Sequence, residues 1–186
     1  MDNPKVTIIL TSYNHAIFLK QSIESALAQT FSNFELIIID DHSTDNSWEI
    51  IQEYKDNRII AIRNKVNQRT GIIRDAINTR ASGEYIAIHH SDDIWAPTKI
   101  EKQVNYLDAH KDAGAVFTHA KIIDENSTLI TDDSNPYYQK FNQPNRNRFE
   151  WLRYFFYHGN ALCNPSGLRR KASLNNLNLN FGFIQL

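Results

Sequence analysis

The chain has 186 residues, of which 41% are hydrophobic and 11% aromatic, with 20 basic and 21 acidic side chains. This composition is typical of a folded globular domain and argues against a disordered chain. The net charge of −1 gives no electrostatic reason to expect nucleic acid as a partner. The single cysteine, Cys163, excludes an internal disulfide and a Cys-x-x-Cys zinc site, and favours a reducing compartment such as the cytoplasm.

The sequence shows no pattern of a secretory signal, a membrane span or a glycine-rich nucleotide-binding loop. The first five residues lead into an apolar run without the pattern of a secretory signal. The longest apolar runs, such as residues 36–39, fall far short of the roughly 20 residues that cross a bilayer. The six glycines have neither GxGxxG nor GxxxxGK spacing, which excludes those two nucleotide-binding loops.

Strands and helices are predicted to alternate along the first 110 residues. Continuous β-branched and aliphatic runs predict strands over 6–10, 34–39, 59–62 and 85–88. Apolar residues at helical spacing predict helices over 17–28, 46–54, 72–81 and 98–110. Asn46 and Glu49 fit a capping box at the start of the second helix. This alternation predicts an α/β fold with a mostly parallel sheet.

The sequence after residue 110 is less regular. Residues 115–123 predict one or two further strands, whereas 124–147 is rich in Asn, Asp, Gln, Ser and Pro and predicts a long surface loop. The aromatic segment 149–157 predicts a helix packed over the sheet edge. Because no linker is visible, we expect one domain over residues 1–186.

Polar residues follow three of the predicted strands. They are Thr11–Asn14, Asp40–Asp41 and Ser91–Asp93, and ligands of open parallel sheets bind beyond such carboxyl ends. Neighbouring carboxylates repel one another unless a cation or hydrogen-bond donors compensate them. Asp93 is the leading candidate to hold Mg²⁺ or Mn²⁺. Asp45 is interpreted as a cap of the following helix.

Other residues near these strand ends have two readings each. His89 and His90 are either metal ligands or residues that complete packing or a hydrogen bond. Arg69 and Arg74 either contact phosphates or lie as surface charges. Tyr13 either stacks on a base or packs against the fold.

Five segments stand out in order along the chain, namely VTIILTSYN at 6–14, SALAQT at 25–30, FELIIIDD at 34–41, GEYI at 83–86 and SDDIWAP at 91–97. Together they resemble the signature motifs of the family 2 glycosyltransferases. The resemblance covers about the first 110 residues. Residues 164–171 resemble the segment of this family that leads toward the acceptor site.

The resemblance implies a GT-A fold and a metal-dependent, inverting transfer of a sugar from a nucleotide diphosphate donor to an acceptor hydroxyl. It places the divalent cation, Mn²⁺ or Mg²⁺, on Asp93, the ribose on Asp92 and the base imide on Asp41. A UDP-sugar is the default donor, although a thymine or guanine imide suits the same contact. The nucleotide-sugar site then comprises Thr11, Tyr13, Asn14, Asp41, Arg69, Arg74 and Asp92.

Four departures from the family pattern stand out. His42 occupies a turn position that commonly holds Gly or Asn, His90 a position that often holds Asp, and Arg69 a position that often holds Gly. The family's general base follows the segment that resembles residues 178–186, so we expect no catalytic base before Leu186. The chain on its own is then expected to be slow or inactive.

The resemblance also implies an organisation and a setting. Residues 1–110 form the nucleotide-sugar and metal-binding half, and 111–186 begin an acceptor half. The implied acceptor is a saccharide or a lipid-linked saccharide in bacterial surface polysaccharide synthesis, with the protein in the cytoplasm or at the inner face of the membrane. Two alternatives stay open, namely a non-catalytic nucleotide-sugar binder and a Mg²⁺-binding, receiver-like phosphotransfer module.

Overall fold

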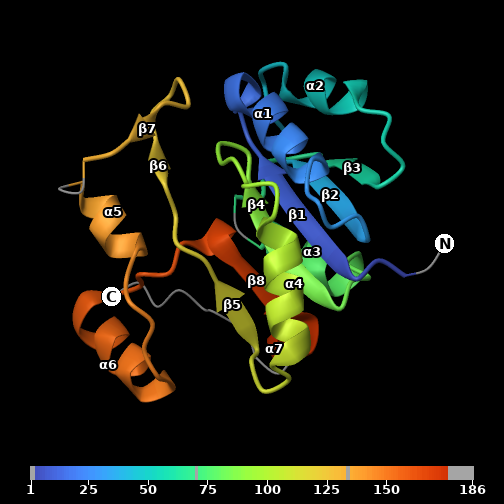
Figure 1. Ribbon diagram of the computed structural model, residues 1–186. Helices are drawn as coiled ribbons and strands as arrows, with labels where there is room; N and C mark the ends of the chain where they lie inside the picture. Colours follow the sequence, from blue (N-terminus) through green and yellow to red (C-terminus); the bar gives the residue numbers. More distant parts are fainter. Residues whose placement is uncertain (1–2, 70, 133–134, 176–186) are drawn as a thin grey trace. The chain divides into compact units, whose positions relative to one another are not determined.

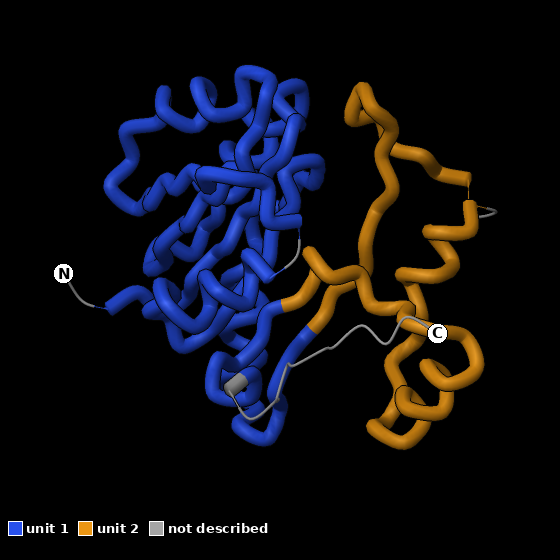
Figure 2. Tube along the Cα trace, turned by 180° about the vertical axis from the view of Figure 1, so that it is seen from behind, with its two compact units in different colours: residues 1–116, 168–186 blue, residues 117–167 orange. Residues whose placement is uncertain are grey.

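A computed structural model describes residues 3–69, 71–132 and 135–175. The chain forms two compact units, one made of Met1–Val116 with Leu168–Leu186 and the other of Phe117–Gly167 (Figure 2). The first is called the sheet unit below, and the second the insert unit. Whether they make up one functional domain stays a prediction.

The sheet unit is built on a mostly parallel sheet, as predicted (Figure 1). Strand β1 pairs in parallel with β2 and β4, β2 pairs in parallel with β3, and β8 is antiparallel to β4. The order across the sheet is β3-β2-β1-β4-β8-β5. The strands are β1 (Val6–Ser12), β2 (Phe34–Asp40), β3 (Ile59–Arg63), β4 (Tyr85–His90), β5 (Ala115–Phe117) and β8 (Gly167–Arg170).

Helices cover both faces of this sheet because its central strands are apolar on both sides. Ile8 and Leu10 point into a core shared with α1, α2 and α4, whereas Ile9 points into a second core shared with α3. Alternate side chains of a strand face opposite sides, so a continuous apolar run needs two covering layers. The helices are α1 (Ala16–Leu27), α2 (Ser47–Glu53), α3 (Ile72–Thr79), α4 (Lys99–Ala109) and α7 (Lys171–Asn175).

The start of α2 differs from the prediction. Its N-cap, Asn46, makes no capping hydrogen bond with its side chain, so the expected capping box with Glu49 is wrong. Asp45 caps instead, because its Oδ1 accepts from Ser47 N at 3.0 Å and its Oδ2 accepts from Ala16 N at 3.0 Å. The structural reading of Asp45 is confirmed, and this one carboxylate ties the starts of α1 and α2 together.

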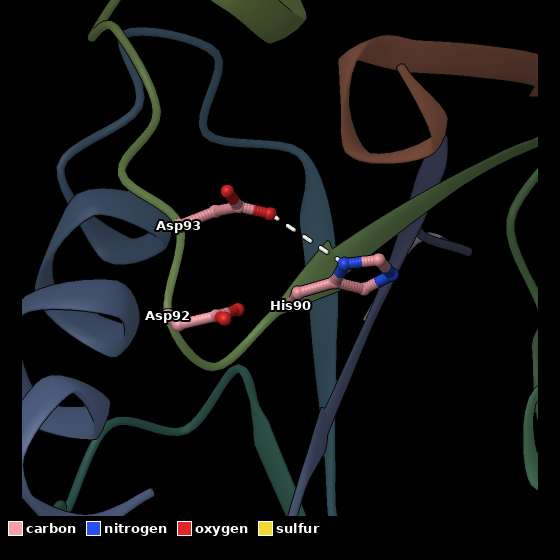
Figure 3. A group of neighbouring side chains, drawn as sticks. All are labelled: His90, Asp92 and Asp93. Atoms are coloured by element: carbon pink, nitrogen blue, oxygen red, sulfur yellow. Dashed lines mark ion pairs between the residues drawn. The ribbon is translucent and has the colours of Figure 1, made fainter. Parts of the chain in front are cut away.

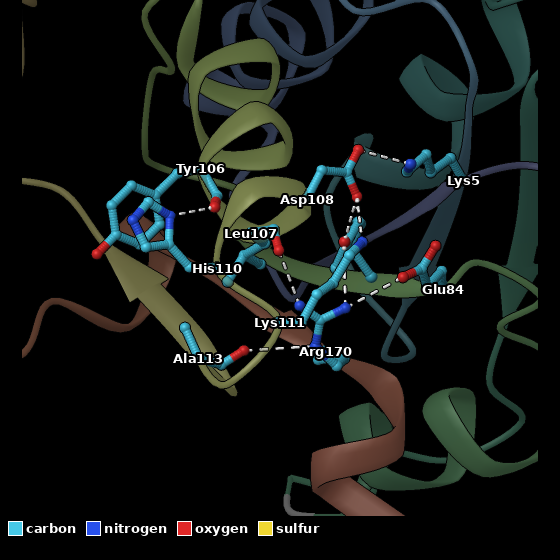
Figure 4. A network of polar contacts seen from close by, with 10 residues as sticks. Lys5, Glu84, Tyr106, Leu107, Asp108, His110, Lys111, Ala113 and Arg170 are labelled. Atoms are coloured by element: carbon cyan, nitrogen blue, oxygen red, sulfur yellow. Dashed lines mark hydrogen bonds and ion pairs between the residues drawn. The ribbon is translucent and has the colours of Figure 1, made fainter.

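A polar network lies where the parallel strands begin, at the opposite end of the sheet from their carboxyl ends (Figure 4). Asp108 of α4 accepts from Lys5 Nζ at 2.7 Å and from the Tyr85 hydroxyl at 2.7 Å. Arg170 of β8 donates to Glu84 at 3.1 Å and to the Leu107 carbonyl at 2.9 Å. The network joins α4 and β8 to the start of β4.

The close packing of β1 and β4 depends on Gly83. A Cβ atom at this position would lie 2.5 Å from Thr7 N and 2.7 Å from the carbonyl carbon of Val6. Gly83 N instead donates to Thr7 Oγ1 at 2.9 Å. Any side chain here would push β4 away from the central strand.

The insert unit is more structured than the predicted surface loop. A hairpin of β6 (Ile122–Ile123) and β7 (Leu129–Ile130) is followed by α5 (Pro136–Phe141), α6 (Arg148–His158) and a short 3₁₀ turn, Asn164–Ser166. The loop prediction for 124–147 is therefore wrong in part, since β7 and α5 lie inside it. The helix predicted at 149–157 is confirmed, and none of its residues is buried, so it is not part of a hydrophobic core; its packing over the sheet edge stays a prediction.

Helix α6 owes its start to a true capping box. Asn147 Oδ1 accepts from Glu150 N at 3.0 Å, and Glu150 Oε2 accepts from Asn147 N at 2.9 Å. Within the described ranges, no helix has both the length and the hydropathy that crossing a bilayer requires.

Candidate functional site

The sheet brings the three polar strand ends to one edge. Strand β1 lies between β2 and β4, with Ser12 opposite Asp40 on one side and Thr11 opposite His90 on the other. The turn after β1 therefore has the turn after β2 on one flank and the turn after β4 on the other. The acidic pairs that follow β2 and β4 stand on opposite sides of β1.

Asp41 is buried, with 4% of its surface exposed, and it holds the loop that follows β3. Its Oδ1 accepts from Asn64 Nδ2 at 2.8 Å and from Gln68 N at 2.9 Å. Its Oδ2 accepts from Arg69 N at 3.0 Å and also from Gln68 N at 3.1 Å. Sequence reasoning missed these partners, because nothing in the 64–69 segment signals that its backbone folds back onto β2. The two oxygens thus make four contacts with three donors, and because Gln68 N is shared between them, a further donor fits where Gln68 N keeps only one of its two contacts.

Asp40 is fully buried, and Arg63 balances its negative charge. Its Oδ2 lies 3.2 Å from Arg63 Nε and accepts from Ser43 N at 3.2 Å. Arg63 also donates to the Ser43 carbonyl at 2.9 Å. Asp40 and Arg63 thus fix the turn that presents Asp41.

Asn14 ties the turn after β1 to the turn after β2. Its Oδ1 accepts from Thr44 N at 2.8 Å, and its N donates to Ser43 Oγ at 3.0 Å. Asn14 and His42 have φ angles of 53° and 66°, which few residues other than Gly, Asn and Asp adopt readily. His42 therefore keeps the left-handed turn that Gly or Asn commonly provides, and Arg69, with φ of 56°, does the same before α3.

Three side chains at the end of β4 and in the following turn form a candidate cation site (Figure 3). One ligand atom from each of His90, Asp92 and Asp93 lies within 4.8 Å of the others. His90 Nδ1 is 3.6 Å from Asp93 Oδ2. Burial raises the pKa of Asp93, the His90 ring opposes this rise, and the negative charge of Asp92 adds to it. A divalent cation would relieve both the desolvation and the repulsion, so this donor set fits the metal that the resemblance implies.

The two neighbouring histidines have separate roles. His89 is fully buried, its Nε2 lies 3.1 Å from Ser22 Oγ, and its ring stacks on Trp95 at 4.1 Å between centroids. Burial lowers the pKa of His89 to about 3, which keeps the ring neutral at physiological pH. His89 therefore completes packing, whereas His90 belongs to the cation cluster.

The remaining predicted site residues lie around this edge with different degrees of exposure. Thr11 is half-buried and Tyr13 is 45% exposed. The side chains of Arg69 and Arg74 are exposed, and Arg74 Nε lies 3.9 Å from Asp75 Oδ1 in the first turn of α3. Their contact with a nucleotide stays a prediction.

A cavity of about 170 Å³ lies beside the Asp41 loop, on the α3 side of the sheet. Asn64 and Gln68, both partners of Asp41, contribute to its wall. None of the predicted site residues lines it. Its remaining lining residues are Ile39, Ile62, Ile72, Asp75, Ala76, Thr79 and Arg80.

Comparison with known proteins identifies the family. The family model described as Glycosyl transferase family 2 matches residues 7–171. An uncharacterised glycosyltransferase of Methanocaldococcus jannaschii is 34% identical over 181 residues, covering 95% of this chain and 59% of that protein. The Escherichia coli UDP-Glc:alpha-D-GlcNAc-diphosphoundecaprenol beta-1,3-glucosyltransferase WfaP is 39% identical over 126 residues, covering 68% of this chain and 49% of that protein. The chain spans about half the length of these relatives.

Solved structures show the same fold. S. aureus TarS 1-349 superposes with a TM-score of 0.68 at 20% identity, covering 92% of this chain and 48% of that one. A mannosyltransferase of Pyrobaculum calidifontis, solved with GDP-Man and Mn²⁺, superposes with a TM-score of 0.56 at 24% identity. The superposition covers 64% of this chain and 36% of that one. The predicted GT-A fold is confirmed, and the chain belongs to glycosyl transferase family 2.

Proposed function

We propose that this chain forms the donor-binding part of an enzyme that transfers a sugar from a nucleotide diphosphate, with a UDP-sugar as the default donor, to an acceptor hydroxyl. The transfer depends on a divalent cation and inverts the anomeric carbon. The observation that carries the proposal is the placement of Asp41 and of the His90, Asp92 and Asp93 cluster on either side of β1.

The Asp41 side of the site suits a base with an imide N–H. The carboxylate is buried and held by Asn64, Gln68 and Arg69, and an imide N–H would take the contact that Gln68 N gives up when it bonds one carboxylate oxygen instead of both. A buried acceptor rejects a ligand that brings no donor, because the acceptor is then left desolvated and unpaired. Uracil supplies that donor, as do thymine and guanine.

The Asp93 side suits a diphosphate held through a cation. Asp93 would supply a hard oxygen ligand, Asp92 could add one carboxylate oxygen while its other oxygen contacts the ribose, and a cation that binds through few protein ligands keeps open positions for phosphate oxygens. When bound, the cation would neutralise negative charge on the departing diphosphate. The residues of the chain orient the donor, with Asp41 at the base and Asp92 at the ribose.

The named ligands and substrates of similar proteins support this assignment. TarS has been solved with UDP and with UDP-GlcNAc, and WfaP is named for UDP-Glc and a diphosphoundecaprenol-linked acceptor. TuaG of Bacillus subtilis is named as a putative teichuronic acid biosynthesis glycosyltransferase. We therefore propose surface polysaccharide synthesis on a lipid-linked or saccharide acceptor, at the cytoplasmic side of the membrane.

Calorimetric titration tests the proposal without an acceptor. The chain is titrated with the diphosphates of uridine, guanosine, thymidine, cytidine and adenosine, each with and without Mn²⁺. Selective binding of an imide base that requires Mn²⁺ supports the proposal. Equal binding of all five, or binding that ignores Mn²⁺, contradicts the base or the metal assignment respectively.

The variant Asp93→Ala tests the metal assignment. It should abolish Mn²⁺-dependent nucleotide binding while the far-ultraviolet circular dichroism spectrum stays unchanged, because Asp93 lies in a turn outside both cores. Asp132→Ala in the insert unit removes a carboxylate elsewhere and should leave binding unchanged. Unaltered binding in Asp93→Ala would remove the metal assignment.

Of the two alternatives, the structure disfavours the receiver-like module. A receiver sheet has the strand order 2-1-3-4-5, whereas this sheet has the order β3-β2-β1-β4-β8-β5 with β8 antiparallel. The non-catalytic binder predicts the same titration results, and an assay of sugar transfer to an acceptor separates it from the enzyme.

A further inference from the structure

We propose that His90 is a direct nitrogen ligand of the divalent cation, and that it shifts the preference of this site from Mg²⁺ toward first-row transition ions such as Mn²⁺. The inference rests on the proposed function, because it concerns the same cation. It starts from the one feature of the cluster that an all-carboxylate site lacks, an imidazole within 4.8 Å of both neighbouring carboxylates.

The backbone of the His90 turn is held by contacts that leave the three candidate ligands unused. Ser22 Oγ donates to the His90 carbonyl at 2.9 Å, and Asp93 N donates to the same carbonyl at 3.2 Å. Ser91 Oγ lies 2.8 Å from His15 Nδ1, and Trp95 N donates to Ser25 Oγ at 3.1 Å. The turn is therefore fixed before any ligand binds.

The His90 ring is half-exposed and faces Asp93. Its side chain is 40% exposed, that of Asp93 is 42% exposed, and the 3.6 Å between Nδ1 and Oδ2 is longer than a hydrogen bond (Figure 3). His89, the adjacent histidine, is fully buried and occupied by Ser22, so it does not compete for the role. Solvent access and convergence on Asp93 make His90 the histidine that a cation at this turn can reach.

An imidazole changes which ion the cluster prefers. Mg²⁺ takes oxygen ligands almost exclusively and gives up water reluctantly. Mn²⁺ also accepts oxygen ligands, but as a first-row transition ion it binds an imidazole nitrogen more readily than Mg²⁺ does. A site with one nitrogen and two carboxylates therefore discriminates against Mg²⁺ more strongly than a site with three carboxylates. Replacing His90 by Asp should restore the all-oxygen preference.

The test measures cation binding directly, with MnCl₂ as the probe in the presence and absence of UDP. Free Mn²⁺ is followed by its electron paramagnetic resonance signal, and Mg²⁺ competes in a second titration. In the unaltered chain, the spin echo of bound Mn²⁺ should carry a nitrogen modulation from imidazole. His90→Ala should lose that modulation and bind Mn²⁺ about tenfold more weakly.

His90→Asp sharpens the result. It should keep Mn²⁺ binding but lower the ratio of the Mg²⁺ to the Mn²⁺ dissociation constant by about fivefold or more, because a hard oxygen replaces the nitrogen. His119→Asp, at an exposed histidine of the insert unit, makes the same change in charge and should alter neither the modulation nor the ratio.

The outcomes separate this inference from the proposed function. Mn²⁺ binding without nitrogen modulation, and with the same ion ratio in His90→Asp, overturns the role of His90 and leaves the metal-dependent donor site standing. Failure of the unaltered chain to bind Mn²⁺ with or without UDP overturns both.

Discussion

The two units of the chain are stabilised in different ways. The sheet unit has a hydrophobic core on each face of the sheet, to which β1, β2 and β4 contribute residues with no exposed surface, such as Ile8, Leu36 and Ile86. Among the described residues of the insert unit, only Ala161 and residues 165–167 are buried. The insert unit relies on capping, local hydrogen bonds and stacked rings instead, with Trp151 and Phe155 at 5.2 Å and the Arg146 guanidinium 4.3 Å from the Tyr154 ring centroid.

The difference shows why the candidate site can be rigid. Turns after β1, β2 and β4 inherit the fixed positions of strands that are locked by hydrophobic burial. Elements held by surface contacts open at lower free energy than elements held by a core. The residues proposed to bind the donor are therefore all anchored on the better-packed unit.

Truncation of a core side chain should give the largest difference between the units. Ile8→Ala removes a fully buried side chain and should lower the free energy of unfolding by about 2–5 kcal/mol, whereas Phe156→Ala, at a ring that is 82% exposed, should change it by less than about 0.5 kcal/mol. Urea denaturation followed by circular dichroism measures both. Similar losses would show that the insert unit is as tightly packed as the sheet unit.

A change at the site comes next in size. Asp41→Ala should weaken uridine diphosphate binding by about 1.5–3 kcal/mol if the carboxylate accepts the imide hydrogen bond. Asp124→Ala, in the β6–β7 hairpin of the insert unit, should leave binding unchanged. Calorimetric titration reports both affinities. An equal loss for all five nucleoside diphosphates would mean that Asp41 acts by holding the loop at Gln68 and Arg69.

His89 should make the sheet unit sensitive to acid. Its pKa falls from 6.5 to about 3 on folding, so below pH 6.5 the unfolded chain binds a proton that the folded chain does not. Stability is therefore lost as the pH falls, by up to about 1.4 kcal/mol per pH unit, or about 2 kcal/mol between pH 7.5 and 5.0.

Urea denaturation of the unaltered chain and of His89→Gln at those two pH values measures this loss. The variant, which cannot titrate, should lose about 2 kcal/mol less than the unaltered chain. His158→Gln, at an exposed histidine of the insert unit, serves as the control and should behave like the unaltered chain. Equal losses in all three chains would show that His89 does not govern the response.

The smallest effect concerns a single helix cap. Asn147→Ala removes the capping box of α6 and should destabilise that helix by about 1 kcal/mol. Thr98→Ala is the matched change in the sheet unit, where the N-cap of α4 makes no capping hydrogen bond with its side chain, and it should have little effect. Amide hydrogen exchange resolves the two helices separately. If Asn147→Ala also reduced the amide protection of α4, the effect of this cap would not be local to α6.

The sequence predicted the sheet unit well because hydrophobic burial leaves a direct pattern. The strands expected at 6–10, 34–39, 59–62 and 85–88 are all present, each extended by one or two residues at its carboxyl end. Elements without an apolar period were missed. Helix α5 is capped by Asn135, whose Oδ1 accepts from Tyr137 N at 2.9 Å, and Asn142 bonds back to Ala120, so the residues that signal a loop here stabilise structure instead.

The sequence singled out candidate site residues, whose role in binding stays a prediction, but it did not indicate their contacts. Asp41 and Asp93 stand out because acidic pairs follow buried strands. Their partners depend on chain folding over longer distances, as with Gln68 and Arg69 closing on Asp41 from 27 and 28 residues away. The different fates of His89 and His90 likewise depend on where β4 ends, two residues later than the apolar run indicates.

The position of β1 between β2 and β4 sets a minimum length for any molecule that contacts both flanks of this edge. Adjacent strands are about 4.8 Å apart, so the ends of β2 and β4 are separated by about 10 Å. A bare cation or a single phosphate can touch only one flank. A molecule that engages both must be elongated, with its two recognised groups joined by a covalent spacer, and the joined molecule gains affinity that the separate pieces lack. The central strand thus sets the length of the spacer that such a molecule needs.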